Sequence, residues 1–259
     1  MENKFFKNLR SAYLIAVYRL KGRYYYSRIG VFIEPITTLI WVFSLTVLFG
    51  SSRDITYLGL GVVTFRFLSE SVANGCFIKF RLENLFLNFG TKDSEKFFWS
   101  SFLECYLLFI LNTIIICPIF FYFGDFSFGE LLFGGIAMIV LSPLFCCSLF
   151  ILFFASATFF PMTQTAVRPV LRLLFFASPI FWGVSDVSNT DAFASQVRIL
   201  VYQVNPFAWM MELVRFFFGY PLPTVLHMTG FIAICSLITL SKFLGSHTFR
   251  EMKRIKWPV

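Results

Sequence analysis

Six apolar stretches, each long enough to cross a bilayer, constrain this chain more than any other feature of its sequence. They cover roughly 31–50, 58–78, 98–123, 129–155, 166–184 and 223–244, and a spanning helix takes about 20 residues. Apolar residues make up 58% of the 259 residues and charged residues only 14%, against about 45–50% and about 25% in a soluble domain. These proportions exclude a soluble enzyme, a disordered tail and a small disulfide-rich scaffold.

The sequence therefore predicts an all-α, polytopic membrane protein with a single transmembrane domain over 1–259. We expect an N-terminal interfacial helix at 1–30 and five spans over 31–184. Two short re-entrant helices, placed like a gate at the periplasmic face, should follow at 185–222, then a sixth span at 223–244 and a basic tail at 245–259.

Lys and Arg are distributed unevenly between the predicted loops. Eighteen of the 22 lie in 1–34, 79–96, 157–172 and the tail, whereas Arg53, Arg198 and Arg215 lie on the opposite side and Arg66 falls inside the second stretch. Because cytoplasmic loops carry the excess of Lys and Arg, both termini are predicted to be cytoplasmic.

Residues 1–30 are predicted to form a basic amphipathic helix rather than a span. Phe5, Leu9 and Ala16 fall on one helical face, with Lys7 and Arg10 opposite, a pattern typical of helices that lie in the membrane interface. A cytoplasmic helix docked on the protein without lipid contact is the alternative.

The apolar segment 197–220 could pass for a seventh span, but two signals divide it. Asn205 followed by Pro206 is a helix start, and Gly219 stands where a helix end belongs. We predict a helix over 206–218, in a segment that dips into the outer leaflet without crossing. A seventh span would also move the basic tail outside.

Charged residues inside the apolar stretches are the strongest local signal. Arg66 and Glu70 are four residues apart and share a helical face, so they are predicted to pair. An unpaired arginine at mid-bilayer costs about 2.5–3.5 kcal/mol, and Glu104 is a second candidate partner. The alternative is a buried pair that only fixes helix register.

Motifs for catalysis or metal binding are absent from the sequence. There is no G-x-S-x-G, H-E-x-x-H or P-loop pattern, the six cysteines form no C-x-x-C pair, and His227 and His247 stand alone. We expect no enzyme activity, cofactor, metal or nucleic-acid partner for this chain, and any ATP with its Mg²⁺ to be held by a partner subunit. The 38 Phe are read either as lipid-facing residues or as the lining of a path for sugar rings.

Several short motifs follow one another along the chain. They are Arg23-x-x-x-x-Arg28-x-Gly30 leading to Glu34-Pro35, then Asn84-Leu85-Phe86, Leu103-Glu104, Phe160-Pro161-Met162, Asn205-Pro206 and Glu212-Leu213-x-Arg215. Their order resembles the membrane-spanning permease of ATP-binding-cassette exporters for capsular polysaccharide and, more distantly, O-antigen. The sequence departs from the family at 89–93, where FGTKD replaces a proline-rich R-P-x-K-P stretch.

The resemblance implies a homodimer in the bacterial inner membrane, with two ATPase subunits docked on its cytoplasmic side. The expected substrate is a lipid-linked polysaccharide, passed to periplasmic and outer-membrane export proteins. The same fold could instead export O-antigen, teichoic acid, a lipid or a drug, and an intramembrane enzyme or assembly factor is the most distant alternative.

The resemblance also assigns roles to three groups of residues. The ATPase-coupling set is Arg81, Glu83, Asn84, Leu85 and Phe86. The set near the substrate path or its lipid-linked end is Arg23, Tyr25, Arg28 and Glu34. The periplasmic gate set is Asn205, Pro206, Trp209, Glu212 and Arg215.

Overall fold

The computed structural model describes residues 4–24, 30–49, 55–89, 94–124, 126–180, 196, 199–200, 202–221 and 240. Every secondary-structure element among them is helical, which confirms the all-α class. The elements are α1 (Lys4–Tyr24), α2 (Gly30–Phe49), α3 (Ile55–Phe89), α4 (Ser94–Phe123), α5 (Phe128–Ile136), the π-helical turn η1 (Ala137–Leu141), α6 (Ser142–Phe159), α7 (Thr163–Ala177) and α9 (Pro206–Phe217).

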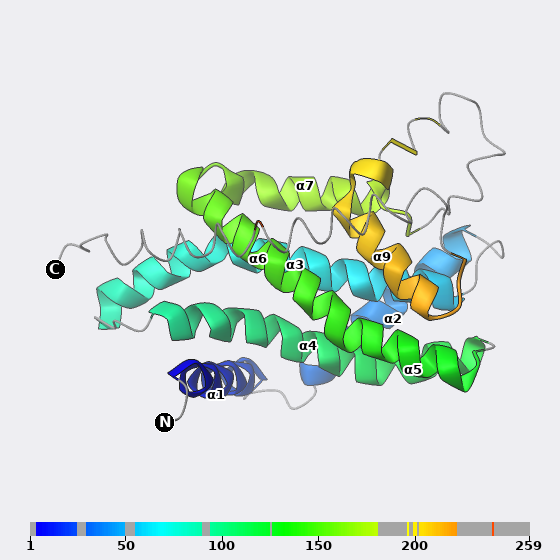
Figure 1. Ribbon diagram of the computed structural model, residues 1–259, viewed down its shortest axis with the longest axis horizontal. Helices are drawn as coiled ribbons and strands as arrows, with labels where there is room; N and C mark the ends of the chain where they lie inside the picture. Colours follow the sequence, from blue (N-terminus) through cyan, green and yellow to red (C-terminus); the bar gives the residue numbers. More distant parts are fainter. Residues whose placement is uncertain are drawn as a thin grey trace.

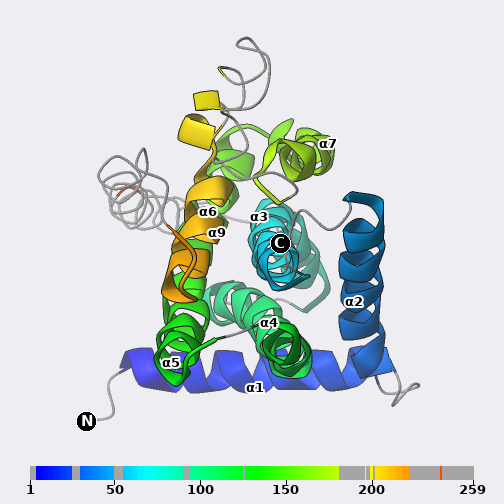
Figure 2. The same ribbon diagram turned by 90° about the vertical axis from the view of Figure 1, so that its right-hand side faces the viewer.

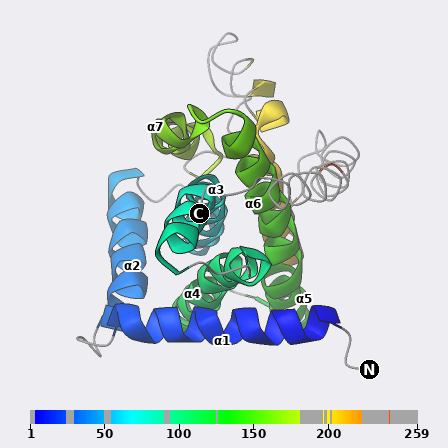
Figure 3. The same cartoon turned by 90° about the vertical axis from the view of Figure 1, so that its left-hand side faces the viewer.

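Helix α3 is the centre of the bundle, and α2, α4, α6, α7 and α9 all pack against it. Helices α3 to α7 run along the long axis of the molecule (Figure 1), whereas α1 lies across α4 at nearly a right angle (Figures 2 and 3). Gly75 lets α3 approach α6 closely, because a Cβ there would lie 2.5 Å from the carbonyl oxygen of Phe150. Phe98 of α4 packs edge-on against the ring of Phe150 at 5.0 Å between centroids.

Five of the six predicted apolar stretches overlap described helices, and 223–244 lies outside the described residues except for residue 240. Among those residues, two segments are long and apolar enough to cross a membrane, Glu95–Ile116 and Phe128–Phe159. A shorter apolar segment covers Phe32–Leu48. Helix α7 has 15 residues, fewer than the about 20 that a perpendicular span takes.

The predicted loop at 79–96 is largely helical, which corrects the sequence-based boundary. Helix α3 continues to Phe89 and α4 begins at Ser94. Charged side chains such as Lys79 and Arg81 mark where a helix leaves an apolar environment, but they do not break it. Gly90 is the next glycine after Gly75, and glycine has the lowest helix propensity apart from proline.

A π-helical turn interrupts the long apolar helix formed by α5 and α6. The N–H of Ser142 donates to the carbonyl of Ala137, five residues back, as a π-bulge requires. Pro143 has no N–H to donate to the carbonyl of Ile139, four residues back. The hydroxyl of Tyr106 on α4 donates to that carbonyl at 3.0 Å, so α4 supplies a donor at the bulge.

The ends of α9 match the sequence prediction. The side chain of Asn205 accepts from the N–H of Phe207 at 3.0 Å and Pro206 opens the helix, which is the expected N-cap arrangement. Beyond the helix end, Gly219 has φ of +87°, a conformation that glycine adopts without strain. Within 185–222, α9 is therefore a short helix, as predicted, and the described residues 196, 199–200 and 202–204 are also helical.

Candidate functional site

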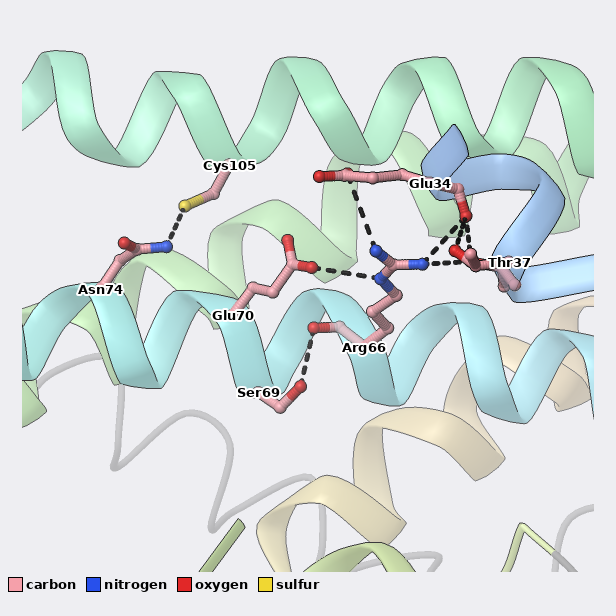
Figure 4. A network of polar contacts seen from close by, with 8 residues as sticks. Glu34, Thr37, Arg66, Ser69, Glu70, Asn74 and Cys105 are labelled. Carbon is pink, nitrogen blue, oxygen red and sulfur yellow. Dashed lines mark hydrogen bonds and ion pairs between the residues drawn. The ribbon is translucent and has the colours of Figure 1, made fainter. Parts of the chain in front are cut away.

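The ion pair predicted between Arg66 and Glu70 is present. The Nε of Arg66 lies 3.1 Å from Oε1 of Glu70, one turn further along α3. Figure 4 shows the two side chains turned toward each other along the helix. Their side chains are 30% and 33% exposed, so both are partly buried.

Helix α2 contributes further acceptors to the same guanidinium. The Nη1 of Arg66 donates to the carbonyl of Glu34 at 3.1 Å and also to the hydroxyl of Thr38. The Nη2 of Arg66 lies 3.7 Å from the Glu34 carboxylate. The sequence analysis placed Glu34 near the substrate path, and the structure adds a direct contact with Arg66 that sequence spacing could not reveal. We call Glu34, Thr38, Arg66 and Glu70 the Arg66 cluster.

Glu104, the second candidate partner for Arg66, lies beside Arg19 of α1. The Nη1 of Arg19 is 3.9 Å from the Glu104 carboxylate and donates to the hydroxyls of Ser101 at 3.0 Å and Ser100 at 3.4 Å. The guanidinium also lies 5.7 Å from the centre of the Phe97 ring. These contacts fasten α1 onto the beginning of α4, together with Ala12 and Ala16, which are fully buried.

A cavity of about 680 Å³ opens between α2, α3 and α7. Part of its wall is aromatic, and the rings of Trp41 and Phe65 each pack edge-on against Phe175, at 6.3 and 5.2 Å between centroids. Another part is charged, from Arg66 and Glu70 on α3 and from two arginines of α7. The full lining is Thr37, Thr38, Trp41, Val62, Phe65, Arg66, Ser69, Glu70, Ala73, Arg168, Leu171, Arg172, Phe175 and Phe176.

Sequence reasoning missed Arg168 and Arg172 as site residues and counted them only as loop charges. Their four-residue spacing on α7 places both on the cavity wall, and this spacing was the available signal. The guanidinium of Arg168 lies 5.0 Å from the centre of the Phe77 ring, a cation–π contact that helps to hold it in place.

The predicted gate residues come together where α9 packs on the beginning of α3. The Nη1 of Arg215 lies 2.6 Å from Oε1 of Glu212, and the exposed fractions of these side chains are 0% and 5%. Arg215 also donates to the carbonyl of Pro179 at 2.6 Å and, from Nη2, to that of Tyr57 at 3.0 Å. The sequence analysis counts Arg215 only by its side of the membrane, and the structure adds that its guanidinium is fully enclosed by protein.

The other gate residues also make specific contacts. The amide of Asn205 donates to the hydroxyl of Ser178 at 2.9 Å, and the indole N–H of Trp209 donates to the carbonyl of Tyr202 at 3.1 Å. Burial raises the pKa of Tyr202, and the nearby Glu212 carboxylate raises it further. Tyr202 therefore stays protonated over any physiological pH.

Several expected site residues lie wholly or partly outside the described part of the chain. Tyr25 and Arg28 fall outside it, and Arg23 is described only by its helical backbone. Arg81 is exposed near the end of α3. The side chains of Glu83, Asn84, Leu85 and Phe86 lie outside the described residues, although their backbone continues α3.

The sequence matches no family model and no curated protein. Within the described residues, no group of three His, Cys, Asp or Glu side chains is placed to hold a metal ion.

Proposed function

We propose that this chain is the permease subunit of an ATP-driven exporter that moves lipid-linked capsular polysaccharide across the bacterial inner membrane. It would act as a homodimer with two ATPase subunits and deliver its substrate to periplasmic and outer-membrane export proteins. The observation that carries the proposal is the cavity between α2, α3 and α7, whose wall combines aromatic rings with Arg168 and Arg172. An amphiphile with an apolar chain and an anionic sugar or phosphate head suits such a wall.

The proposed placement has six spans and both termini in the cytoplasm. The orientation of α1 supports it, because a helix at nearly a right angle to α3 and α4 lies in the membrane plane when those two cross the bilayer (Figure 2). Large apolar side chains that face away from the bundle also support it, among them Val47 at 83% exposed and Ile114 at 65%.

Cysteine labelling tests this topology. In a background without the six native cysteines, a single cysteine at Ser188 should react with an impermeant maleimide from outside. One at Ser246 should react only after the inner face is opened, since the basic tail is expected in the cytoplasm. Labelling of position 246 in intact cells would show that the tail lies outside, which contradicts the proposed orientation.

The ATPase is proposed to dock at the end of α3 that carries 81–86. This end belongs to 79–96, which is predicted to be the longest charged cytoplasmic connection and contains Asn84-Leu85-Phe86. Docking on a continuous helix, rather than on a loop, would transmit motion directly toward the Arg66 cluster, which lies on the same helix.

The deciding experiment is co-purification with an ATPase, followed by mass spectrometry of the bound amphiphile. Replacing both Arg168 and Arg172 by Gln should reduce bound glycolipid about tenfold or more, because each lost charge-assisted contact is worth about 1.5–3 kcal/mol. ATPase binding should be retained in that variant. Arg10→Gln, an exposed arginine of α1, is the matched control and should bind normally.

The identity of the bound molecule separates the alternatives. Capsular repeats on a lipid anchor support the proposal. Bound O-antigen, a teichoic-acid-like polymer, a plain lipid or a drug would mean that an exporter of the same fold carries another substrate. Absence of both an ATPase and an amphiphile from the purified protein would refute the exporter function.

A further inference from the structure

A second hollow of about 530 Å³ lies between α1, α2, α3 and α4. Glu70 lines both spaces. The volume falls within the about 300–1,000 Å³ that is common for small-ligand sites. The residues that matter for its chemistry are Arg19, Arg81, Glu34, Glu70, Asn74 and Glu104.

The two arginines of this hollow come from different helices. Arg19 is held against α4 by Glu104 and Ser101. Arg81 of α3 makes no hydrogen bond or ion pair with any residue that the structure describes. Burial lowers the pKa of Arg19, Glu104 raises it and the nearby Arg81 cation lowers it again. An anion between the two guanidiniums would relieve this repulsion.

The same hollow also carries three carboxylates, from Glu34, Glu70 and Glu104. Each of them already contacts an arginine of the protein, Arg66 for the first two and Arg19 for the third. A purely anionic ligand would meet three negative groups, and a purely cationic ligand would meet two arginines. A ligand that bears both charges satisfies both parts of the wall.

An exposed aromatic residue precedes each of the two arginines in its helix. Tyr18, next to Arg19, is 70% exposed, and Phe80, next to Arg81, is 57% exposed. Exposed rings beside a charged hollow provide contact for hydrocarbon chains at the level of the headgroups. The ligand is therefore better matched by a lipid than by a small soluble zwitterion.

We propose that this hollow binds the phosphoethanolamine headgroup of a phospholipid, with its phosphate at Arg19 and Arg81 and its ammonium group toward the carboxylates. Guanidinium groups bind phosphate through paired hydrogen bonds. A primary ammonium donates three hydrogen bonds to carboxylates, whereas choline donates none and glycerol carries no cation. The proposal shares the membrane placement of the proposed function but is independent of the transported substrate.

The test is lipid selection by the full-length protein. Protein stripped of lipid is reconstituted with equal amounts of phosphatidylethanolamine, phosphatidylglycerol and phosphatidylcholine, then extracted, and the retained lipid is measured by native mass spectrometry. We expect phosphatidylethanolamine to be enriched about tenfold over the other two, which corresponds to about 1.4 kcal/mol. Equal retention of the three lipids overturns the proposal.

Arg81→Gln supplies the residue-level check, because Arg81 has no partner in the described structure whose loss would disturb folding. This variant should lose most of the enrichment, and Arg10→Gln should keep it. Unchanged enrichment in Arg81→Gln overturns the site.

Soluble phosphoethanolamine should compete only weakly, and competition at equal concentration would overturn a lipid as the ligand. No ATPase or glycolipid takes part, so failure of the exporter proposal leaves this measurement interpretable.

Discussion

Replacing Arg215 by methionine is expected to destabilise the protein by about 3–5 kcal/mol, the usual cost of removing one member of a buried charge pair. The change leaves the Glu212 carboxylate, 5% exposed, without the cation that lies 2.6 Å away. It also removes the donor to the carbonyls of Tyr57 and Pro179. The yield of monodisperse protein and its melting temperature in detergent measure the loss.

Two further variants show whether charge or geometry dominates. Arg215→Lys keeps the charge but replaces a planar fork by a single ammonium group, which cannot span Glu212, Pro179 and Tyr57 together. We expect Arg215→Lys to be less stable than the wild type but more stable than Arg215→Met. The double change Arg215→Met with Glu212→Met should recover part of the loss, because no isolated charge stays buried. Wild-type stability in Arg215→Met would contradict the role assigned to this cluster.

Local signals in the sequence predicted the ends of helices well. Asn205, Pro206 and Gly219 act through the hydrogen bonds and backbone angles of their own segment, so their effect can be read without the tertiary structure. The same holds for the spacing of Arg66 and Glu70, since a helix brings residues four apart together. These elements appear in the structure as predicted.

Contacts between distant segments could not be predicted from the same patterns. Arg215 binds backbone carbonyls of Tyr57 and Pro179, and any residue type offers such a carbonyl. Glu104 lies beside Arg19 because α1 crosses α4, and the direction of that crossing follows from packing rather than from spacing. The 680 Å³ cavity likewise depends on how α7 returns across α2 and α3.

Removing Arg66 is expected to cost more stability than removing Glu70. Arg66→Met leaves the carboxylates of Glu70 and Glu34 without the guanidinium that lies 3.1 and 3.7 Å from them. Glu70→Met leaves Arg66 with the carbonyl and carboxylate of Glu34 and the hydroxyl of Thr38. The four-residue spacing alone predicts that Arg66→Met and Glu70→Met lose equal stability. The contacts of Arg66 with α2 predict a larger loss of stability for Arg66→Met.

A double-mutant cycle measures the coupling between the two residues. Arg66→Met with Glu70→Met should lose less than the sum of the single changes, by about 1–3 kcal/mol, because neighbours in one ion network couple to this extent. Simple additivity would show that the contact contributes nothing to folding. Under the proposed exporter function, export by the double variant separates two roles. Normal export in a folded protein means that the cluster serves only to fix α2 against α3. Loss of export with normal folding means that Arg66 and Glu70 act on the substrate as it passes the cavity that they line.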